Sequence, residues 1–278
     1  MTKKGTFKRK NLQNKSRGGN GFSRFFHYSF WTYTIGAILF FGILCGAFYY
    51  FFIDSNSFRW RSIFHTTTYP EGYNVRGIDV SHYQEEIDWL RLRNASMNND
   101  PISFVIVKAT EGVSLFDQYF NENFYQAKAN GLIRGAYHFY IPTANPREQA
   151  KFYLRQVHLE QGDLPPIIDV EEIKGKTASE LRNDVKIWLD IVENQYGAKP
   201  ILYTSYKFFL DYFNTQEFQE YPLWIAHYYV PKLRYKGKWV LWQHTDCGKI
   251  DGIKGKVDCN IFNGSLRELH DFTLRAEE

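Results

Sequence analysis

Four acidic residues stand at the ends of short apolar runs that predict β-strands. Asp169 and Glu171 close one such run. Asp79 closes an earlier run, and Asp258 opens a later one. Because side chains alternate along a strand, positions 169 and 171 point to the same face. Two carboxyl groups that lie close together repel, which raises the pKa of one of them and keeps a proton available near neutral pH.

Glycoside hydrolysis uses a carboxyl pair of this kind. One carboxylic acid protonates the leaving oxygen, and a second carboxylate stabilises or attacks the developing cation. An Asp-x-Glu sequence alone is a weak signal, since acids after an apolar run are often loop residues, but here three separate runs carry them. The same carboxylates could instead bind a hard cation. The sequence contains no H-E-x-x-H and no Cys/His cluster with zinc spacing, and we expect neither a metal nor another cofactor.

The elements that must position these acids alternate between two types. Helix signals include Thr177 and Glu180 with capping-box spacing, a stop at Gly197, a start at Asn145 and a stop at Gly131. β-branched and aromatic runs predict eight strands, over 75–80, 104–109, 135–140, 166–171, 200–204, 223–226, 239–243 and 257–261.

Strands that alternate with helices indicate a parallel α/β arrangement. Eight strands in about 200 residues favour a barrel whose later connections have lost their helices. A doubly wound open sheet is the alternative, but the sequence has no glycine-rich strand-to-helix turn of the dinucleotide or P-loop kind. In a parallel barrel the loops after the strands converge at one end, so acids at strand ends should meet there.

The N-terminal segment differs from the rest in charge and hydropathy. The chain carries a net charge of +4, and its first 53 residues hold eight basic residues and no acidic one, so the remainder carries −4. Because the basicity belongs to this tail, we expect no nucleic-acid partner. Residues 30–53 form a near-continuous apolar run, long enough to cross a bilayer as a helix. The cations before it favour the cytoplasmic side.

These observations predict a single-pass protein of the cytoplasmic (inner) membrane with its N-terminus inside and its catalytic domain periplasmic or extracellular. A cleaved signal peptide is the competing interpretation. The predicted parts are a basic cytoplasmic tail (1–29), a transmembrane signal-anchor helix (30–53), a linker (54–72), a catalytic domain (73–271) and a C-terminal tail (272–278).

The three cysteines fall in different parts of this plan. Cys45 lies in the apolar run, while Cys247 and Cys259 lie twelve residues apart in the outer domain. In an oxidising compartment the last two could form a disulfide. Two free structural thiols are equally compatible with the sequence.

The sequence resembles the family 25 glycoside hydrolases, the Chalaropsis-type lysozymes (N-acetylmuramidases) that cleave bacterial cell-wall peptidoglycan. The matching stretches occur in family order, at 77–84, 87–89, 104–112, 135–140, 168–171, 201–204, 223–226, 242–245 and 255–260. No single stretch identifies the family, but the combination of all of them in this order is specific for it. The resemblance departs at His244, where the family usually has a tyrosine.

The resemblance implies a flattened TIM-like (β/α)5β3 barrel, here preceded by one transmembrane helix. The bond cleaved would be the β-1,4 link between N-acetylmuramic acid and N-acetylglucosamine in peptidoglycan glycan strands. By position, Glu171 matches the general acid, and Asp169 matches the carboxylate that stabilises a substrate-assisted intermediate. Asp79 and Asp258 match two supporting acids. The alternatives are a glycan-binding protein without turnover and a hydrolase of a chitin-like polymer.

Further polar and aromatic residues fall near the ends of the predicted strands. Aromatic rings suit the C–H faces of sugars, and hydroxyl or amide groups can bind an N-acetyl group. With the family match, this favours substrate binding by Tyr137, Tyr203, Trp224 and Gln243. The alternative is that these side chains fill the barrel. We expect structural roles for His138 and His227.

Overall fold

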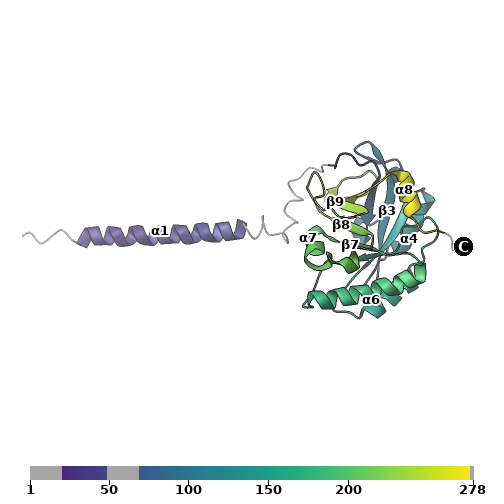
Figure 1. The fold of residues 1–278 in the computed structure, drawn as a ribbon. Helices are drawn as coiled ribbons and strands as arrows, with labels where there is room; N and C mark the ends of the chain where they lie inside the picture. The colour runs from purple at the N-terminus through teal and green to yellow at the C-terminus, as the bar shows by residue number, and fades with distance from the viewer. Residues whose placement is uncertain (1–20, 49–68, 276–278) are drawn as a thin grey trace, which may run out of the picture. The chain divides into compact units, whose positions relative to one another are not determined.

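The computed structural model describes residues 21–48 and 69–275, which belong to two separate units, Met1–Phe64 and His65–Glu278. The first unit contains the helix α1 (Gly21–Phe48) (Figure 1). Its segment Trp31–Phe48 is long and apolar enough to cross a membrane, and none of that segment is buried in protein. The helix begins within the predicted tail, ahead of the expected start at residue 30. Residues 49–53 and most of the predicted linker lie outside the described residues.

The second unit is built on a sheet that closes into a barrel. Its eight strands are β1 (Arg76–Val80), β3 (Asp100–Glu111), β5 (Ile133–Phe139), β6 (Ile167–Asp169), β7 (Ile201–Ser205), β8 (Leu223–Ala226), β9 (Leu241–Gly248) and β10 (Val257–Phe262). They pair in the order β1-β10-β9-β8-β7-β6-β5-β3, and β3 pairs with β1 to close the ring. Among these eight strands, β10 alone runs antiparallel to both of its neighbours. The predicted barrel is confirmed, and the open sheet is excluded.

Five connections between strands carry helical segments. They are α3 (Trp89–Arg93), α4 (Phe120–Ala129), α5 (Pro146–Gln156), α6 (Ala178–Tyr196) and α7 (Tyr206–Phe208), the last continued by a π-helical turn, η4 (Phe209–Phe213), and by η5 (Gln216–Phe218). The chain from β8 through β9 to β10 has no helix, which gives the expected (β/α)5β3 arrangement. A final helix, α8 (Leu266–Phe272), follows the barrel.

The helix signals in the sequence mark real ends. Thr177 and Glu180 form a capping box at the start of α6, and Gly197 ends the helix with φ 62°. Asn145 caps α5 by accepting two backbone N–H groups. Two short strands pair with β3: β2 (Ser96–Met97) and β4 (Leu115–Phe116). Neither was among the eight predicted strands. Two residues are too few to show an alternating pattern.

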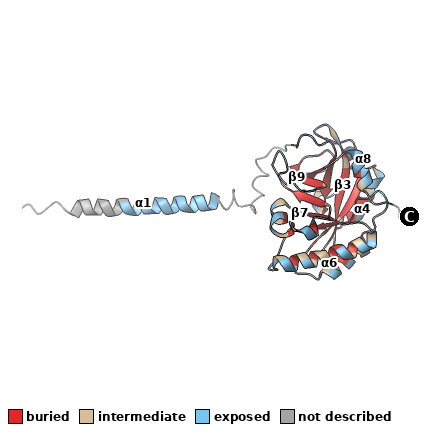
Figure 2. Ribbon diagram, in the orientation of Figure 1, coloured by how far each residue is buried: buried red, intermediate tan, exposed pale blue. Residues whose placement is uncertain are grey.

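Alternation along the strands divides the core into two layers. One cluster packs between the sheet and the helices and includes Val105, Val107 and Trp188. The other fills the barrel interior and includes Phe104 and Ile106. Figure 2 shows the buried strands at the centre and α6 with its outer face exposed. The interior is tight, since a Cβ on Gly77 would lie 2.3 Å from the Phe104 ring. Apolar side chains therefore block one end of the barrel, and a polar site can form only at the other.

Candidate active site

The inward-facing positions become polar toward one end of the barrel. On the parallel strands this is the carboxyl end, where Asp79 and Asp169 follow apolar or glycine positions on the same face. On the antiparallel β10 it is the amino end, so Asp258 reaches the same level. The register places Asp258 directly opposite Asp79. Three of the four predicted acids thus come from the barrel wall itself.

Asp79 and Asp258 form one carboxyl pair. Burial raises the pKa of Asp79 to about 6, and it raises the pKa of Asp258 well above its ordinary value, with the nearby Asp79 charge adding to it. The hydrogen bond between the two side chains lowers the pKa of Asp79 and raises that of Asp258. Asp258 is therefore the weaker acid of the pair, and in its protonated form it donates a hydrogen bond to an ionised Asp79.

Two buried amides hold Asp79 in its ionised form. Gln243 donates from Nε2 to Asp79 Oδ2 at 2.7 Å, and Asn260 donates from Nδ2 to the same oxygen at 2.7 Å. Both amides are at most 2% exposed. An oxygen that accepts two N–H groups in a buried site favours a negative charge. We call Gln243 and Asn260 the amide clamp.

A second layer of donors fixes the orientation of the amide clamp. Trp224 donates from Nε1 to Asn260 Oδ1 at 2.8 Å. Tyr203 and Tyr228 donate their hydroxyl groups to Gln243 Oε1, at 2.7 and 2.6 Å. Because the oxygen of each amide accepts a hydrogen bond from these donors, the NH₂ group of each amide must face Asp79.

This layer gives a testable role to Trp224. Trp224→Phe keeps a ring at the site but removes the N–H donor, which frees Asn260 to turn its oxygen toward Asp79. We expect kcat to fall about tenfold with little change in KM, as for the loss of one hydrogen bond that leaves a buried acceptor unsatisfied. The pH dependence of kcat should shift as well, because Asp79 loses a donor. Tyr196→Phe, which removes a hydroxyl bonded to Val157 O on the outside of the barrel, is the control. An unshifted profile with normal kcat would contradict this role.

Asp169 and Glu171 form the second carboxyl pair. Asp169 ends β6 and is 7% exposed, and its Oδ1 has no hydrogen-bond partner. Glu171 lies two residues beyond the strand and is exposed, although protein atoms surround its carboxyl group closely. Burial raises both pKa values, and the charge of Glu171 raises that of Asp169 further. The Tyr203 hydroxyl has one proton, which can be directed to Gln243 Oε1 or to Glu171, and a hydrogen bond to Glu171 opposes the shift there.

A buried cation lies among these carboxyl groups. Lys108 is 7% exposed, and its Nζ lies 2.6 Å from Glu111 Oε2 and 4.9 Å from the centre of the Phe139 ring. Its charge lowers the pKa of Asp169 and of Glu171, against the effect of burial. Lys108 thus limits how much the negative charges of the site repel one another.

The four residues predicted to bind substrate have different surroundings. Tyr137 is half-buried, and the surrounding acids add to the burial that raises its pKa well above the ordinary value. Tyr203, Trp224 and Gln243 are 5%, 2% and 2% exposed and belong to the hydrogen-bonded layers around Asp79. This leaves them little surface for a sugar, so we expect them to act through Asp79. Direct sugar contact stays a prediction for Tyr137.

Sequence reasoning gave no role to Asn260, Tyr228 or Lys108. All three follow the inward alternation of their strands: Asn260 stands two residues after Asp258, and Tyr228 two residues after Ala226 at the end of β8. Asn260 and Lys108 lie within β10 and β3, where the period-2 pattern already marks them as inward-facing, and continuing that pattern past the end of β8 would have added Tyr228.

One buried histidine and the two cysteines of the barrel take no part in the carboxyl pairs. His138 bonds Thr110 and Gln149, and burial lowers its pKa to about 3. Cys247 and Cys259 both keep their thiols, so the disulfide left open by the sequence is not formed. A register irregularity places Cys259 opposite Thr245, and the two cysteines are therefore not cross-strand partners.

Comparisons with known proteins agree with this architecture. Residues 78–253 match the family model for glycosyl hydrolases family 25. The protein YegX of Escherichia coli (strain K12) is 44% identical over 214 residues, which cover 75% of this chain and 77% of the relative. Lysozyme M1 of Streptomyces globisporus is 31% identical over 218 residues, 70% of each chain. The solved structure of a family 25 glycosyl hydrolase from Bacillus anthracis matches with a TM-score of 0.67 at 29% identity, covering 75% of this chain and 98% of that one.

Proposed function

The chain belongs to the glycosyl hydrolases family 25, and we propose that it is a membrane-anchored muramidase of peptidoglycan. It would hydrolyse the β-1,4 bond between N-acetylmuramic acid and N-acetylglucosamine. The observation that carries this proposal is the meeting of two carboxyl pairs, Asp79 with Asp258 and Asp169 with Glu171, at one end of the barrel. Glycoside hydrolysis needs an acid and a stabilising carboxylate in one site.

Glu171 is the member of its pair that can reach the leaving group. It is exposed, whereas Asp169 is buried in the wall of the barrel. We assign to Glu171 the transfer of a proton to the glycosidic oxygen as the bond from that oxygen to C1 breaks. The raised pKa of Glu171 supports this role, because the acid must hold its proton near neutral pH.

Asp169 would orient the substrate's own acetamido group. Its Oδ1, which has no partner within the described residues, can accept the acetamido N–H once the side chain turns toward the bound sugar, and this contact turns the acetamido oxygen toward C1. That oxygen then bonds to C1 as the leaving oxygen departs with the proton from Glu171. A hydrogen bond to the ionised form lowers the pKa of Asp169 and so shifts the proton of the pair to Glu171.

The second half of the reaction reverses these roles. Glu171, now a carboxylate, accepts a proton from a water molecule whose oxygen bonds to C1. The bond from C1 to the acetamido oxygen breaks, and the configuration at C1 is retained. Ionised Asp79, held by the amide clamp, contributes negative charge that stabilises the cationic transition states, and Asp258 supplies the hydrogen bond that keeps Asp79 in place.

The bond that is cleaved can be identified from the products. Purified peptidoglycan is digested with the full-length protein in detergent, reduced with borohydride and analysed by mass spectrometry. We expect new reduced ends that carry muramic acid. Reduced glucosamine ends would assign the opposite bond, and no new ends would favour a glycan-binding protein. Cleavage of chitin at a comparable rate would favour the chitin-like substrate.

The anchor is the second part of the proposal. It is supported by the apolar helix Trp31–Phe48 and by the cations that precede it in the sequence. Membranes from expressing cells are washed with alkaline carbonate, which removes peripheral proteins. We expect the chain to stay in the pellet at full mass. Recovery in the soluble fraction at reduced mass would instead indicate a cleaved signal peptide.

A further inference from the structure

The connection between β9 and β10 lies beside the carboxyl groups but has no part in the chemistry proposed above. Residues 249–256, which we call the lysine loop, join the end of β9 to the start of β10. β9 runs parallel to the strands that carry the carboxyl groups, so this connection lies at the same end of the barrel. Asp258 follows Lys256 by two residues.

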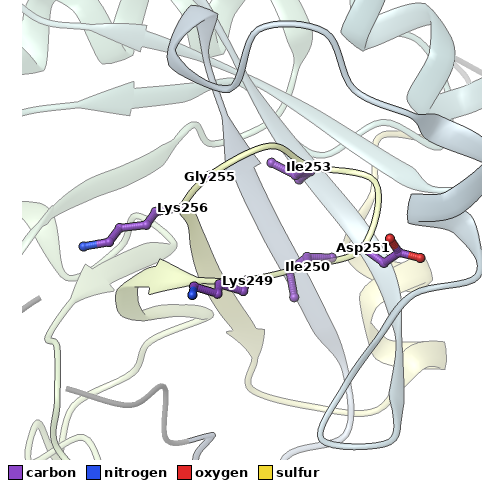
Figure 3. A pocket seen from close by; sticks show the side chains of 6 residues that line it. All are labelled: Lys249, Ile250, Asp251, Ile253, Gly255 and Lys256. Carbon is purple, nitrogen blue, oxygen red and sulfur yellow. The ribbon is translucent and has the colours of Figure 1, made fainter. Parts of the chain in front are cut away.

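The lysine loop surrounds an open pocket of about 520 Å³. Figure 3 shows its lining, with the side chains of Lys249 and Lys256 on the side of the loop away from Asp251. Ile250 and Ile253 form the apolar part of the lining. A pocket with apolar walls and a few charged groups suits a ligand that combines carbon surface with charge.

The lysine loop is held in a fixed shape. Gln84 donates from Nε2 to Lys256 O at 3.1 Å, and Asp88 N donates to Gly252 O at 2.9 Å. Gly252 has φ +96°, and a Cβ there would lie 2.5 Å from Asp88 O. Ile250 is 5% exposed and packs in the core between sheet and helices. A ligand therefore meets a preformed surface and does not have to order it.

The charge of the lysine loop is opposite to that of its domain. Lys249, Lys254 and Lys256 are exposed, and the lysine loop contains one acid, Asp251, whose Oδ1 lies 3.7 Å from Arg91 Nη1. Within residues 69–275, Lys249 and Lys254 take part in no ion pair, whereas residues 54–278 as a whole carry a net charge of −4. Cations concentrated at the rim of an acidic site attract a partner with negative charge.

We propose that the lysine loop binds the carboxylates of the peptide stems carried by the muramic acid residues of the substrate. This inference rests on the proposed function, since it is a muramidase that meets these stems beside the bond it cleaves. Where a stem is attached, the lactyl carboxyl group of muramic acid is an amide, so the sugar backbone itself gives the lysines no charge to bind. Stem peptides combine free carboxylates with short aliphatic side chains, which matches the lysine and isoleucine lining.

The test compares two substrates with two sets of variants of the full-length protein in detergent. One substrate is intact peptidoglycan. The other is the same glycan after an amidase has removed the stems and the lactyl carboxylates that this frees have been converted to methylamides, so that neither stem nor sugar carries a carboxylate. The test variant is Lys249→Gln/Lys254→Gln/Lys256→Gln, and the control is Lys236→Gln/Lys238→Gln, which removes exposed charge elsewhere. On intact peptidoglycan we expect the triple variant to raise KM about fivefold with kcat unchanged, since exposed ion pairs are individually weak. On the stripped glycan it should match the wild type.

The other possible results distinguish a failure of this inference from a failure of the proposed function. An equal rise in KM on both substrates, or no rise on either, would overturn the inference but leave the proposed muramidase activity standing. Weaker binding to phosphatidylglycerol vesicles with unchanged stem dependence would overturn it in favour of a membrane contact. If the wild type cleaved neither substrate, the proposed function would fail first. A thermal melt of each variant separates these outcomes from loss of folding.

Discussion

Glu171→Gln is expected to lower kcat/KM on peptidoglycan about 1000-fold, because a positioned general acid contributes on the order of 10² to 10⁴ in rate. Glutamine keeps the size of the side chain and its place beyond β6 but cannot deliver a proton to the leaving oxygen. Initial rates of wall solubilisation measure the effect. Glu172→Gln is the matched control. Glu172 forms an ion pair with Lys174, and its charge helps to raise the pKa of Glu171, so its loss should move the basic limb of the pH profile to lower pH while leaving the proton donor in place.

A loss of less than tenfold in Glu171→Gln would remove the residue from its role as the acid. The same conclusion would follow if Glu172→Gln lost as much activity as Glu171→Gln, since the effect would then reflect the charge of the segment and not proton transfer.

Asp169→Asn is expected to lower kcat/KM by about 10² to 10³, the range for loss of one preorganised electrostatic contact with a developing charge. It should also stabilise the folded protein at neutral pH. The folded-state pKa of Asp169 is raised above its unfolded value, so the folded state binds the proton more tightly. The carboxyl group therefore costs stability increasingly as the pH rises above the unfolded pKa near 4, and asparagine removes that cost.

Asp163→Asn provides the matched contrast. Asp163 is 2% exposed, like Asp169 a buried acid, but it lies 2.7 Å from the Arg134 guanidinium. Removal of one member of a buried ion pair costs about 3 to 5 kcal/mol. Thermal melts at pH 7 should therefore shift in opposite directions for the two variants, and Asp163→Asn should keep its activity below its melting temperature. A lower melting temperature for Asp169→Asn than for the wild type would contradict the raised pKa of Asp169 in the folded state.

The strands and the barrel could be predicted from sequence because both depend on local pattern. β-branched runs of four to six residues are strong strand signals, and the capping box at Thr177 has a direct physical effect on the backbone. The strand predicted over 166–171 ends two residues earlier than expected, because β6 stops at Asp169. Glu171 is therefore not part of the strand, and the position of its side chain depends on the loop that follows β6.

The roles of the aromatic residues could not be read from local pattern. A tryptophan at the end of a strand fits a sugar platform and a barrel filler equally well. Only the register of β8, β9 and β10 shows that Trp224 faces Asn260 and that Gln243 faces Asp79. The same holds for Cys247 and Cys259, whose separation in sequence allows a disulfide that the offset pairing of β9 and β10 does not form.

The division of work between Glu171 and Asp169 can be tested with a substrate that needs no acid. In an aryl β-glycoside of N-acetylmuramic acid with a strongly electron-withdrawing phenol, the leaving group departs without a proton. We expect the first-turnover release of phenol by Glu171→Gln to approach that of the wild type, while Asp169→Asn stays slow because its acetamido contact is lost. If Glu171→Gln lost the same factor on this substrate as on peptidoglycan, Glu171 would not be the acid, and the chemistry assigned to the two carboxyl pairs would be wrong.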